Sequence, residues 1–587
     1  MPGFEITRKH IDLDVKADGS YLQIYEVAYK VLTKQGRDAV QKFEFSYTEG
    51  YQKTLITGAY TLKADGTKIP VSSKGILYGQ GASSGPGFSD VKTISVFFPD
   101  VEIGDTVVLQ TYFRQTQPWF AGQFATSFDF TRKVAAHDVR VTLTAPDTLA
   151  LQIDISGLEG GKRESAGGQT YWAWTFHNDS AQRPEEDSVD EADEGPHLAL
   201  GSFADFGQVA SVYRAIMDDK AEVTPEIKSL ANNLTRGVSN RREQAGKLYD
   251  WVSTNIAYVS LVLGAGGFTP HQASEVLARK YGDCKDHVML LEALLKAKGI
   301  ESSPVLINTG NTYRLPGAAS PFIFDHLITY IREFNLFADS TARVASFGVL
   351  PGSDAGKPVI IVKTGKMATT PTVTAKTYQI FSTSKVRFSA NGELEGRSDV
   401  RALGAASIDM RGSIGEIAAD GDDDYFRGFL GPGASGTLDR GDPTRLSDEY
   451  DFSATYRVSD AVNFPGPAAI AGGVAYKPFF FTYMIGGNLP PTRTQSWICP
   501  SLTAEEDTTT EFPRDTKIIS LPKSETLQTK EVSLQITYAT PSPSSVRQIV
   551  RLVVDHPETV CTAAYYNGVR DDLAKMVAAL RKQIVYQ

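Results

Sequence analysis

The stretch YGDCKD at residues 281–286 runs directly into apolar residues whose spacing predicts a helix over 286–298. Gly299 follows at the position where glycine commonly ends a helix. Cys284 therefore lies at a helix start, where unpaired N–H groups and the positive end of the helix dipole favour a thiolate over a thiol. Because the thiolate is the reactive form of cysteine, the stretch predicts a nucleophile.

A histidine and an aspartate follow this helix in two runs that are typical of strands. His326 lies in the run 324–331, and Asp339 ends the run 335–339. If these runs form an antiparallel hairpin, the two side chains face each other about 5 Å apart. Attack on an amide carbonyl needs a nucleophile, a base that takes its proton and a group that orients the base. The sequence therefore predicts a catalytic triad of Cys284, His326 and Asp339.

Other residues compete for roles at this site. The backbone N–H of Cys284 is the expected first donor to an oxyanion, and Tyr258 and Gln272 are the candidates for the second. His287 is a rival base on the same helix, but its side chain should project from the helix body. His271 is a more remote rival, in a loop that follows a cluster of glycines. Neither displaces the histidine of the strand as the expected base.

Length and charge limit the classes of protein and partner. At 587 residues the chain is too long for a single core. Its formal net charge of −10 argues against nucleic acid or an anionic membrane as the main partner. No apolar run reaches the roughly 18 residues of a membrane helix, so no membrane insertion is expected. The sequence leaves the oligomeric state open.

The sequence predicts no metal or cofactor for this chemistry. Cys284 has no CxxC partner and the eight histidines are scattered, which argues against zinc. Seven acidic residues in the segment 184–196 suggest calcium, but their spacing fits no EF-hand loop. A solvated linker is the preferred interpretation of that segment. Whether any activity depends on calcium stays open.

Cysteine usage and the N-terminus leave the compartment open. Cys499 and Cys561 could form a disulfide in an oxidising compartment, or remain two buried thiols. No leader is visible at residues 1–4. The chain is therefore expected to be either cytosolic or the mature form of an exported protein.

The patterning changes twice along the chain and predicts three domains. Residues 1–204 alternate apolar and polar side chains between glycine turns, which predicts an antiparallel β-sandwich. Residues 205–365 read as helices followed by strands, an α+β core. Residues 366–587 return to strands and end in a helix predicted over 571–585. The expected fold class is therefore multidomain α+β with β-rich ends.

Some local segments carry more specific expectations. Hairpin turns are expected at Asp18-Gly19, Asp65-Gly66 and Asn391-Gly392. The run 479–485 is expected to be a buried strand, and 420–424 a polar turn. The glycines at 264–267 predict a tight loop rather than a phosphate loop, because no Gly-Lys-Ser/Thr follows them.

The motifs around the cysteine resemble the transglutaminase-like (papain-like) superfamily. The similarity rests on YGDCKD, on FDH at 324–326 and on FADST at 337–341. Residues 251–258 and 264–270 are similar to the bacterial branch, which commonly carries an N-terminal β-sandwich of uncharacterised function. The pair His287-Val288 departs from the small or charged pair that is usual there.

This resemblance implies a central papain-like core between an N-terminal β-sandwich and a C-terminal β-rich domain. It also implies that Cys284, His326 and Asp339 form the catalytic triad. Because the bacterial branch is typically exported, it implies a periplasmic setting despite the missing leader, with the cytoplasm as the alternative.

Together, these observations predict thiol-dependent acyl transfer at a peptide or side-chain amide through a Cys284 thioester. Water as the acceptor makes the enzyme a peptidase or amidase, and an amine makes it a transamidase. Hydrolysis is slightly favoured, because water is the default acceptor. The expected partner is a protein or peptide substrate. The alternative is a non-catalytic envelope binding or scaffold protein that retains the fold. A third hypothesis is that the β domains recognise a polymer, such as envelope glycans or glycoproteins, in service of the enzyme.

Overall fold

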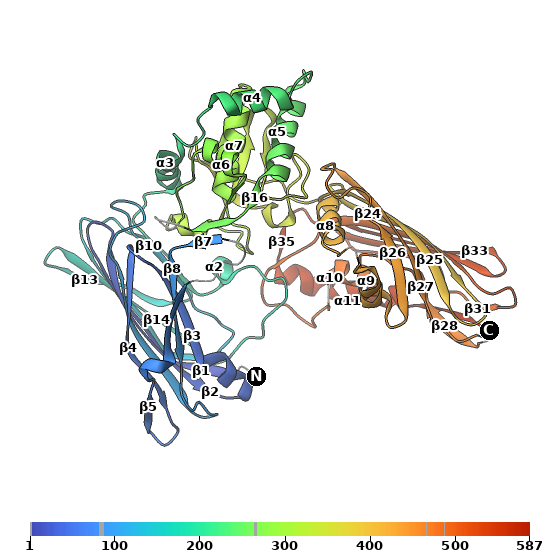
Figure 1. Ribbon diagram of the computed structural model, residues 1–587. Coiled ribbons are helices and arrows are strands. Elements are labelled where there is room, and N and C mark those ends of the chain that lie inside the picture. The colour runs from blue at the N-terminus through green and yellow to red at the C-terminus, as the bar shows by residue number, and fades with distance from the viewer. Residues whose placement is uncertain (1–2, 81–86, 263–266, 419, 465, 487) are drawn as a thin grey trace. The chain divides into compact units, whose positions relative to one another are not determined.

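The computed structural model describes residues 3–80, 87–262, 267–418, 420–464, 466–486 and 488–587 (Figure 1). Contacts divide the chain into two compact units, Met1–Asn335 with Pro358–Thr369, and Leu336–Lys357 with Thr370–Gln587. The chain therefore leaves the first unit at Asn335, returns to it at Pro358 and leaves it again at Thr369. The predicted division into three domains at 204/205 and 365/366 stays a prediction.

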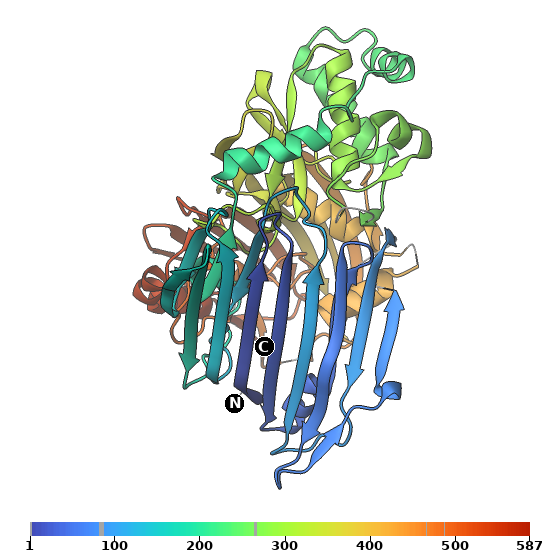
Figure 2. The ribbon, with the colours of Figure 1, turned by 90° about the vertical axis from the view of Figure 1, so that its left-hand side faces the viewer.

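An eight-stranded sheet forms the N-terminal part of the first unit, and Figure 2 looks onto its long strands. Its order is β13-β14-β11-β1-β2-β9-β4-β5. In chain order its strands are β1 (Phe4–Val15), β2 (Tyr21–Val31), β4 (Gln52–Leu62), β5 (Lys68–Pro70), β9 (Thr106–Gln115), β11 (Ala136–Pro146), β13 (Glu159–Ala166) and β14 (Gln169–Asn178). All of its pairs are antiparallel except β1–β11, which is parallel.

Two smaller sheets complete this sandwich. One has the order β10-β15-β12 (Ala125–Asp129, His197–Gly201 and Gln152–Ser156), and the other β3-β8-β6 (Lys42–Thr48, Val91–Phe97 and Ile76–Gln80). Both cover the same face of the large sheet, because Tyr25 and Tyr29 of β2 pack against both hydrophobic clusters. Helix α1 (Lys34–Val40) follows β2. The expected turns at Asp18-Gly19 and Asp65-Gly66 are confirmed, since both glycines have positive φ, 87° and 91°.

The rest of the first unit consists of helices followed by an antiparallel sheet. The helices are α3 (Phe206–Met217), α4 (Pro225–Leu234), α5 (Arg241–Asn255), α6 (Ala273–Arg279) and α7 (Cys284–Ala297). Within this unit the sheet runs β20-β19-β22-β23 (His326–Ile331, Ser302–Ile307, Pro358–Ile361 and Lys366–Thr369). Helix α7 packs against β19 and β20 and against the other helices α4, α5 and α6. Every residue from Lys285 to Leu295 is buried, so α7 is the central helix.

The sandwich is joined to this helical part by strand pairing and by carboxylates. Strand β7 (Gly87–Ser89) pairs in parallel with β17 (Ser260–Val262). Asp193 accepts hydrogen bonds from the backbone N–H groups of Tyr313, at 2.6 Å, and Arg314, at 3.0 Å. Asp190 caps the short helix α2 (Glu191–Glu194) in the same acidic segment. The acidic residues of 184–196 are exposed or half-buried, in agreement with the expected solvated segment, but Asp193 also ties it to the backbone at residues 313 and 314.

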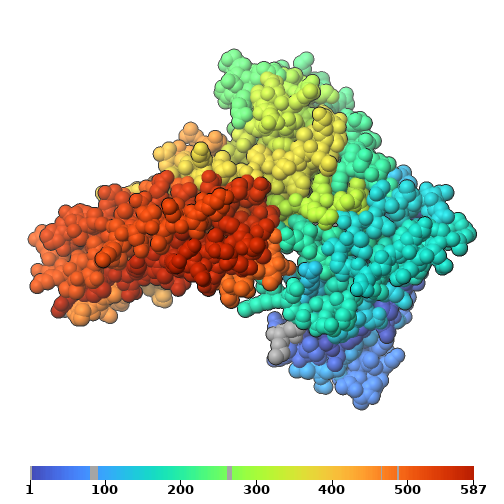
Figure 3. Space-filling view, turned by 180° about the vertical axis from the view of Figure 1, so that it is seen from behind, coloured from blue at the N-terminus to red at the C-terminus, as the bar shows by residue number. Residues whose placement is uncertain are grey.

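The second unit is built on another eight-stranded sheet. Its order is β26-β27-β25-β24-β30-β34-β33-β32, with one parallel pair, β24–β30. The strands are β24 (Tyr378–Phe388), β25 (Leu394–Gly404), β26 (Ala434–Asp439), β27 (Glu449–Val458), β30 (Leu502–Glu511), β32 (Glu525–Gln528), β33 (Val532–Ser542) and β34 (Ser545–Val554). The hairpin expected at Asn391-Gly392 joins β24 and β25. Helix α8 (Ala405–Gly415) packs against β24, β25 and β27. Figure 3 shows the later part of this unit as one orange-to-red body.

Three sequence-based expectations for this unit are wrong. Residues 420–424 do not form a simple turn, because Asp422 begins helix α9 (Asp422–Leu430), where carboxylates suit the positive helix end. The run 479–485 contains helix α10 (Phe481–Gly486) instead of a strand, since a short apolar run has no period that separates the two. The third error concerns only the bounds of the helix expected over 571–585: the helix is present, but it is α11 (Ala563–Leu580). Residues Gln583–Tyr586 form β36, which pairs with β28 (Ala468–Ala471) and β31 (Ile518–Ser520).

Cys499 and Cys561 form a disulfide, with 5.7 Å between their Cα atoms. The bond links the end of the two-residue strand β29 (Trp497–Ile498) to β35 (Val560–Cys561). These strands pair with each other, with Trp497 opposite Cys561. The sequence left this pairing open, and the structure decides it. None of the described helices is long and apolar enough to cross a membrane.

The disulfide should stabilise the second unit by restricting its unfolded chain. Replacing both cysteines, Cys499→Ala with Cys561→Ala, is expected to lower the free energy of unfolding by about 4 kcal/mol, given the separation of 62 residues. Urea unfolding followed by tryptophan fluorescence measures this change. Cys284→Ala is the control, because that thiol is outside the bond. Equal midpoints for the double variant and the control would contradict the prediction.

Asp250 on α5 should make the stability of the protein depend on pH. Burial raises the pKa of Asp250 to about 6, and Lys247 opposes this shift only in part. Between about pH 4 and 6 the folded protein keeps a proton that the unfolded chain releases, so this contribution to stability falls as pH rises. Asp250→Asn should therefore raise the free energy of unfolding by about 1–2 kcal/mol above pH 6. This value allows for the partial exposure of the side chain.

Thermal unfolding at several pH values measures this gain, which should vanish near pH 4. The exposed carboxylate of Glu222, in the same unit, offers the matched change Glu222→Gln, which should produce no such pH-dependent gain. A gain of Asp250→Asn that is equal at pH 4 and pH 8 would exclude the titration of this side chain as its cause.

Candidate active site

Cys284 is the first residue of α7, and Asp283 is its N-cap. The cysteine is a free thiol and half-buried. The N–H of His287 donates to the carbonyl of Asp283 at 3.0 Å, which closes the first turn of the helix. The predicted position of the cysteine at a helix start is thus confirmed, although the helix begins two residues earlier than expected.

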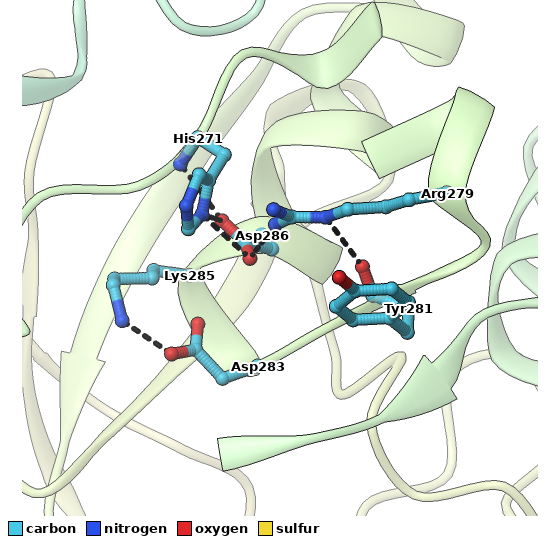
Figure 4. A network of polar contacts seen from close by, with 6 residues as sticks. All are labelled: His271, Arg279, Tyr281, Asp283, Lys285 and Asp286. Carbon is cyan, nitrogen blue, oxygen red and sulfur yellow. Dashed lines mark hydrogen bonds and ion pairs between the residues drawn. The ribbon is translucent and has the colours of Figure 1, made fainter. Parts of the chain in front are cut away.

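The carboxylate of Asp286, two residues after the cysteine, binds two other segments (Figure 4). Its side chain is fully buried. Oδ1 accepts a hydrogen bond from the backbone N–H of His271 at 2.8 Å, and the His271 ring lies 3.1 Å from both carboxylate oxygens. Arg279 donates from Nη2 to Oδ2 at 2.7 Å, and from Nε to the carbonyl of Tyr281 at 2.9 Å. Asp286 therefore ties the first turn of α7 to the end of α6 and to the loop before it.

Glycine is required at position 282 because Asp286 packs against its backbone. A Cβ added at Gly282 would lie 2.5 Å from Cβ of Asp286 and 2.8 Å from its Oδ2. Gly282 belongs to β18 (Tyr281–Gly282), which pairs in parallel with β16 (Ala257–Tyr258). The N–H of Val259 donates to the carbonyl of Gly282 at 2.9 Å. The chain entering α7 is thus held by backbone pairing on one side and by a side chain on the other.

The charged pair Asp283 and Lys285 flanks the cysteine, and both side chains are almost fully buried. Burial raises the pKa of Asp283, Lys285 opposes this shift, and the negative charge of Asp286 adds to it. Lys285 therefore supplies the counter-charge for a buried carboxylate next to Cys284.

Sequence reasoning missed an aromatic cluster that reaches toward the cysteine. Tyr213 of α3 is buried, and burial raises the pKa of its phenol, with the charge of Cys284 adding to the shift. The ring of Tyr213 lies 5.7 Å from that of Phe120 and 6.1 Å from that of Phe268. Trp119 is 6.1 Å from Phe268. No local sequence signal marks this cluster, because its members come from segments that meet only in the folded chain.

His326 is the first residue of β20, and it is half-buried. It pairs with Ile307 of β19, and α7 packs against both strands. The preceding residue, Asp325, binds the backbone N–H of Thr309 at 2.9 Å, which fixes the entry of the chain into β20. The histidine therefore stands at the end of a strand on the sheet that supports the helix of Cys284.

Asp339 directly follows β21 (Leu336–Ala338) and belongs to the second unit. Its carboxylate is buried, and Oδ1 accepts from the N–H of Thr341 at 2.8 Å and from its hydroxyl at 2.7 Å. The turn expected between the strands of His326 and Asp339 is present as a 3-10 helix at Arg332–Phe334. Because the two residues fall in different units, the predicted His326–Asp339 contact stays a prediction.

The other residues that the sequence offered for this site, as rival bases or as second oxyanion donors, lie in different environments. His287 is fully buried within α7, with its ring 6.1 Å from that of Tyr258. His271 lies against Asp286, as described above. Tyr258 is 44% exposed, which leaves it accessible to a ligand. Gln272 is the N-cap residue of α6, and its amide lies 3.4 Å from Asp219. The predicted tight loop at 264–267 lies largely outside the described residues.

Among the described residues, two groups have the spacing to hold a metal ion, and neither includes Cys284. One is Cys499, His556 and Cys561, whose two sulfur atoms form the disulfide. The other is His137, His177 and Asp179 in the N-terminal sandwich.

Two segments match known protein families. Residues 17–182 match the family described as a domain of unknown function with a solved structure, DUF3857. Residues 228–319 match the transglutaminase-like superfamily, and this match includes Cys284 but ends before His326 and Asp339. No curated protein matches the chain.

Solved structures provide a further comparison. A candidate protease from Parabacteroides distasonis is similar over 100% of this chain and 99% of its own, with a TM-score of 0.72 and 15% identity, which shows a common fold alone. A candidate cysteine protease from Cytophaga hutchinsonii aligns over 58% of this chain and 78% of its own, with a TM-score of 0.17 and 11% identity. An M1 zinc metallopeptidase from Deinococcus radiodurans aligns over 34% of this chain and 42% of its own, with a TM-score of 0.20 and 15% identity.

The last two likenesses are too weak to carry an argument. The family matches agree with the motifs around Cys284 and with the β-rich N-terminal part of the chain. The chain therefore combines a DUF3857 domain with a domain of the transglutaminase-like superfamily.

Proposed function

We propose that the protein is an enzyme that transfers acyl groups from peptide or side-chain amides through a thioester on Cys284. The observation that carries this proposal is the position of a free, half-buried thiol on the first residue of a central helix. The helix start favours the thiolate. Asp286 and Gly282 hold that helix start in place, and such support is what a nucleophile needs.

In the proposed reaction, His326 takes the proton of the Cys284 thiol, and Sγ attacks the carbonyl carbon of the amide. The backbone N–H of Cys284 donates to the oxyanion that forms. When the C–N bond breaks, His326 gives the proton to the leaving amine, and the acyl group remains on sulfur. Asp339 orients the imidazole and stabilises its charged form. This chemistry requires no cofactor.

Water then resolves the thioester, and the net reaction is hydrolysis of the amide. This makes the protein a cysteine peptidase or amidase. An amine in place of water would make it a transamidase. The proposed substrate class is a protein or peptide.

We place the protein in the periplasm. The Cys499–Cys561 disulfide supports this location, because such bonds persist in oxidising compartments and are rare in the cytosol.

The alkylation rate of Cys284 tests the proposed nucleophile and base. In the folded protein without reductant, iodoacetamide should modify Cys284 rapidly even at pH 6.5, where an ordinary thiol is about 1% ionised. His326→Ala should slow this reaction about 10-fold or more, because the thiol loses its base. Asp339→Asn should slow it less, because the imidazole remains. Mass spectrometry of timed samples measures the rates.

His10→Ala is the matched control, because His10 is on β1 in the N-terminal sandwich. That variant should react as the unmodified protein does. If Cys284 behaves as an ordinary thiol, and if His326→Ala changes nothing, the enzymatic proposal fails and a binding or scaffold role takes its place.

Gly282 offers a test of the support under the nucleophile. Gly282→Ala should destabilise the first unit by about 1–3 kcal/mol, because the added methyl group overlaps Asp286. The alkylation rate of Cys284 should fall with it, since the start of α7 must shift. Gly317→Ala is the control in the same unit, because its Cβ would meet its nearest neighbour at an ordinary 3.6 Å. Thermal unfolding and alkylation measure both effects, and an unchanged Gly282→Ala variant would contradict the proposed support.

A further inference from the structure

A group of metal-ligating side chains lies in the N-terminal sandwich, outside the candidate active site. His137, His177 and Asp179 each offer one ligand atom, and these atoms lie within 4.8 Å of one another. We propose that these three residues form a surface site for a divalent transition metal ion, with Zn²⁺ as the ion of choice. This inference does not rest on the proposed enzymatic function.

A β-bulge brings the two histidines together. Ala136 pairs with Asn178 and Val139 pairs with Phe176, so two residues of β11 oppose the single residue His177 of β14. A bulge turns a side chain away from the direction that a regular strand would give it. The rings of His137 and His177 have centroids 5.9 Å apart. The two histidines thus lie on paired strands of the large sheet, and Asp179 directly follows β14.

Both imidazole rings have the second contact that is typical of metal-binding histidines. Nδ1 of His177 lies 3.0 Å from the carbonyl oxygen of His137, which can only accept, so Nδ1 carries the hydrogen. Nε2 of His177 donates its hydrogen to Oδ1 of Asp179 at 2.7 Å, and a bound metal ion would take the place of this hydrogen. Nε2 of His137 lies 3.3 Å from the carboxylate of Glu5. Such partners orient a ligating ring and raise its basicity.

The distances allow metal binding after a small movement. Metal–ligand bonds of about 2.0–2.1 Å in a tetrahedral site separate the ligand atoms by about 3.4 Å. A separation at the upper limit of 4.8 Å therefore has to close by about 1.4 Å. The three side chains are exposed, at 41% for His137, 54% for His177 and 82% for Asp179, so rotation about their side-chain bonds is sufficient.

The ligand chemistry selects the type of ion. Two imidazole nitrogens favour zinc, copper or nickel over magnesium and calcium, which prefer oxygen ligands. Three protein ligands also leave one tetrahedral position open, as in zinc sites that bind water or an external donor.

Isothermal titration of the full-length protein with ZnCl₂, without reductant, tests the proposal. Cys284 is first capped with iodoacetamide, so that its thiol does not bind the ion. We expect one Zn²⁺ per chain. His177→Ala and Asp179→Asn should each weaken binding by about 100-fold, since loss of a ligand costs at least as much as loss of an outer partner. Glu5→Gln should weaken it by about 10-fold.

Asp138→Asn is the matched control, because this neighbouring carboxylate pairs with Arg8 and His10 instead. It should bind Zn²⁺ as the unmodified protein does, and Ca²⁺ should not compete. The proposal is overturned if the capped protein binds no Zn²⁺, if His177→Ala binds it with unchanged affinity, or if Ca²⁺ displaces it at equal concentration. Circular dichroism of each variant confirms that the sandwich is folded.

Discussion

The buried carboxylate of Asp286 is the constraint on which the candidate site depends. It accepts hydrogen bonds from the backbone of His271 and from the guanidinium of Arg279, so three segments converge on one side chain. A buried charge is tolerated only when it is paired and hydrogen-bonded, and removing one partner of such a pair commonly costs about 3–5 kcal/mol. The motif YGDCKD therefore fixes the packing around the start of α7 as well as placing the cysteine there. Its glycine makes room for the aspartate, and its aspartate fixes the helix that carries the cysteine.

Local sequence signals predicted the elements around this site well. The apolar spacing after Cys284 predicted α7, and the glycine turns predicted the hairpins of both β-rich regions. These signals are strong because each depends on a few neighbouring residues. The two family matches also agree with the resemblance drawn from the motifs. Whether His326 contacts Asp339 could not be derived in the same way, and it stays a prediction, because the two residues belong to separate units.

Signals that depend on distant residues were missed or misread. The aromatic run around Phe481 looked like a strand, yet it forms a helix that packs against α11, 80 or so residues later. The acidic segment before β15 is solvated as expected, but the binding of Asp193 to the backbone at Tyr313 and Arg314 was missed. Tyr213 and Phe120 meet beside Phe268 from three different parts of the chain. In each case the partner that decides the structure lies far away in the sequence.

The interrupted path of the chain has a consequence for protein synthesis. Strands β22 and β23, which complete the sheet supporting α7, lie at 358–369, after an excursion of the chain into the second unit. At about 5–20 residues per second, the ribosome needs several seconds to pass from the end of α7 to the end of β23. During that interval the nascent polypeptide carries α7 without the two strands that complete its supporting sheet. The first unit can therefore finish folding only after residue 369 has been synthesised, so its completion depends on a late part of the chain.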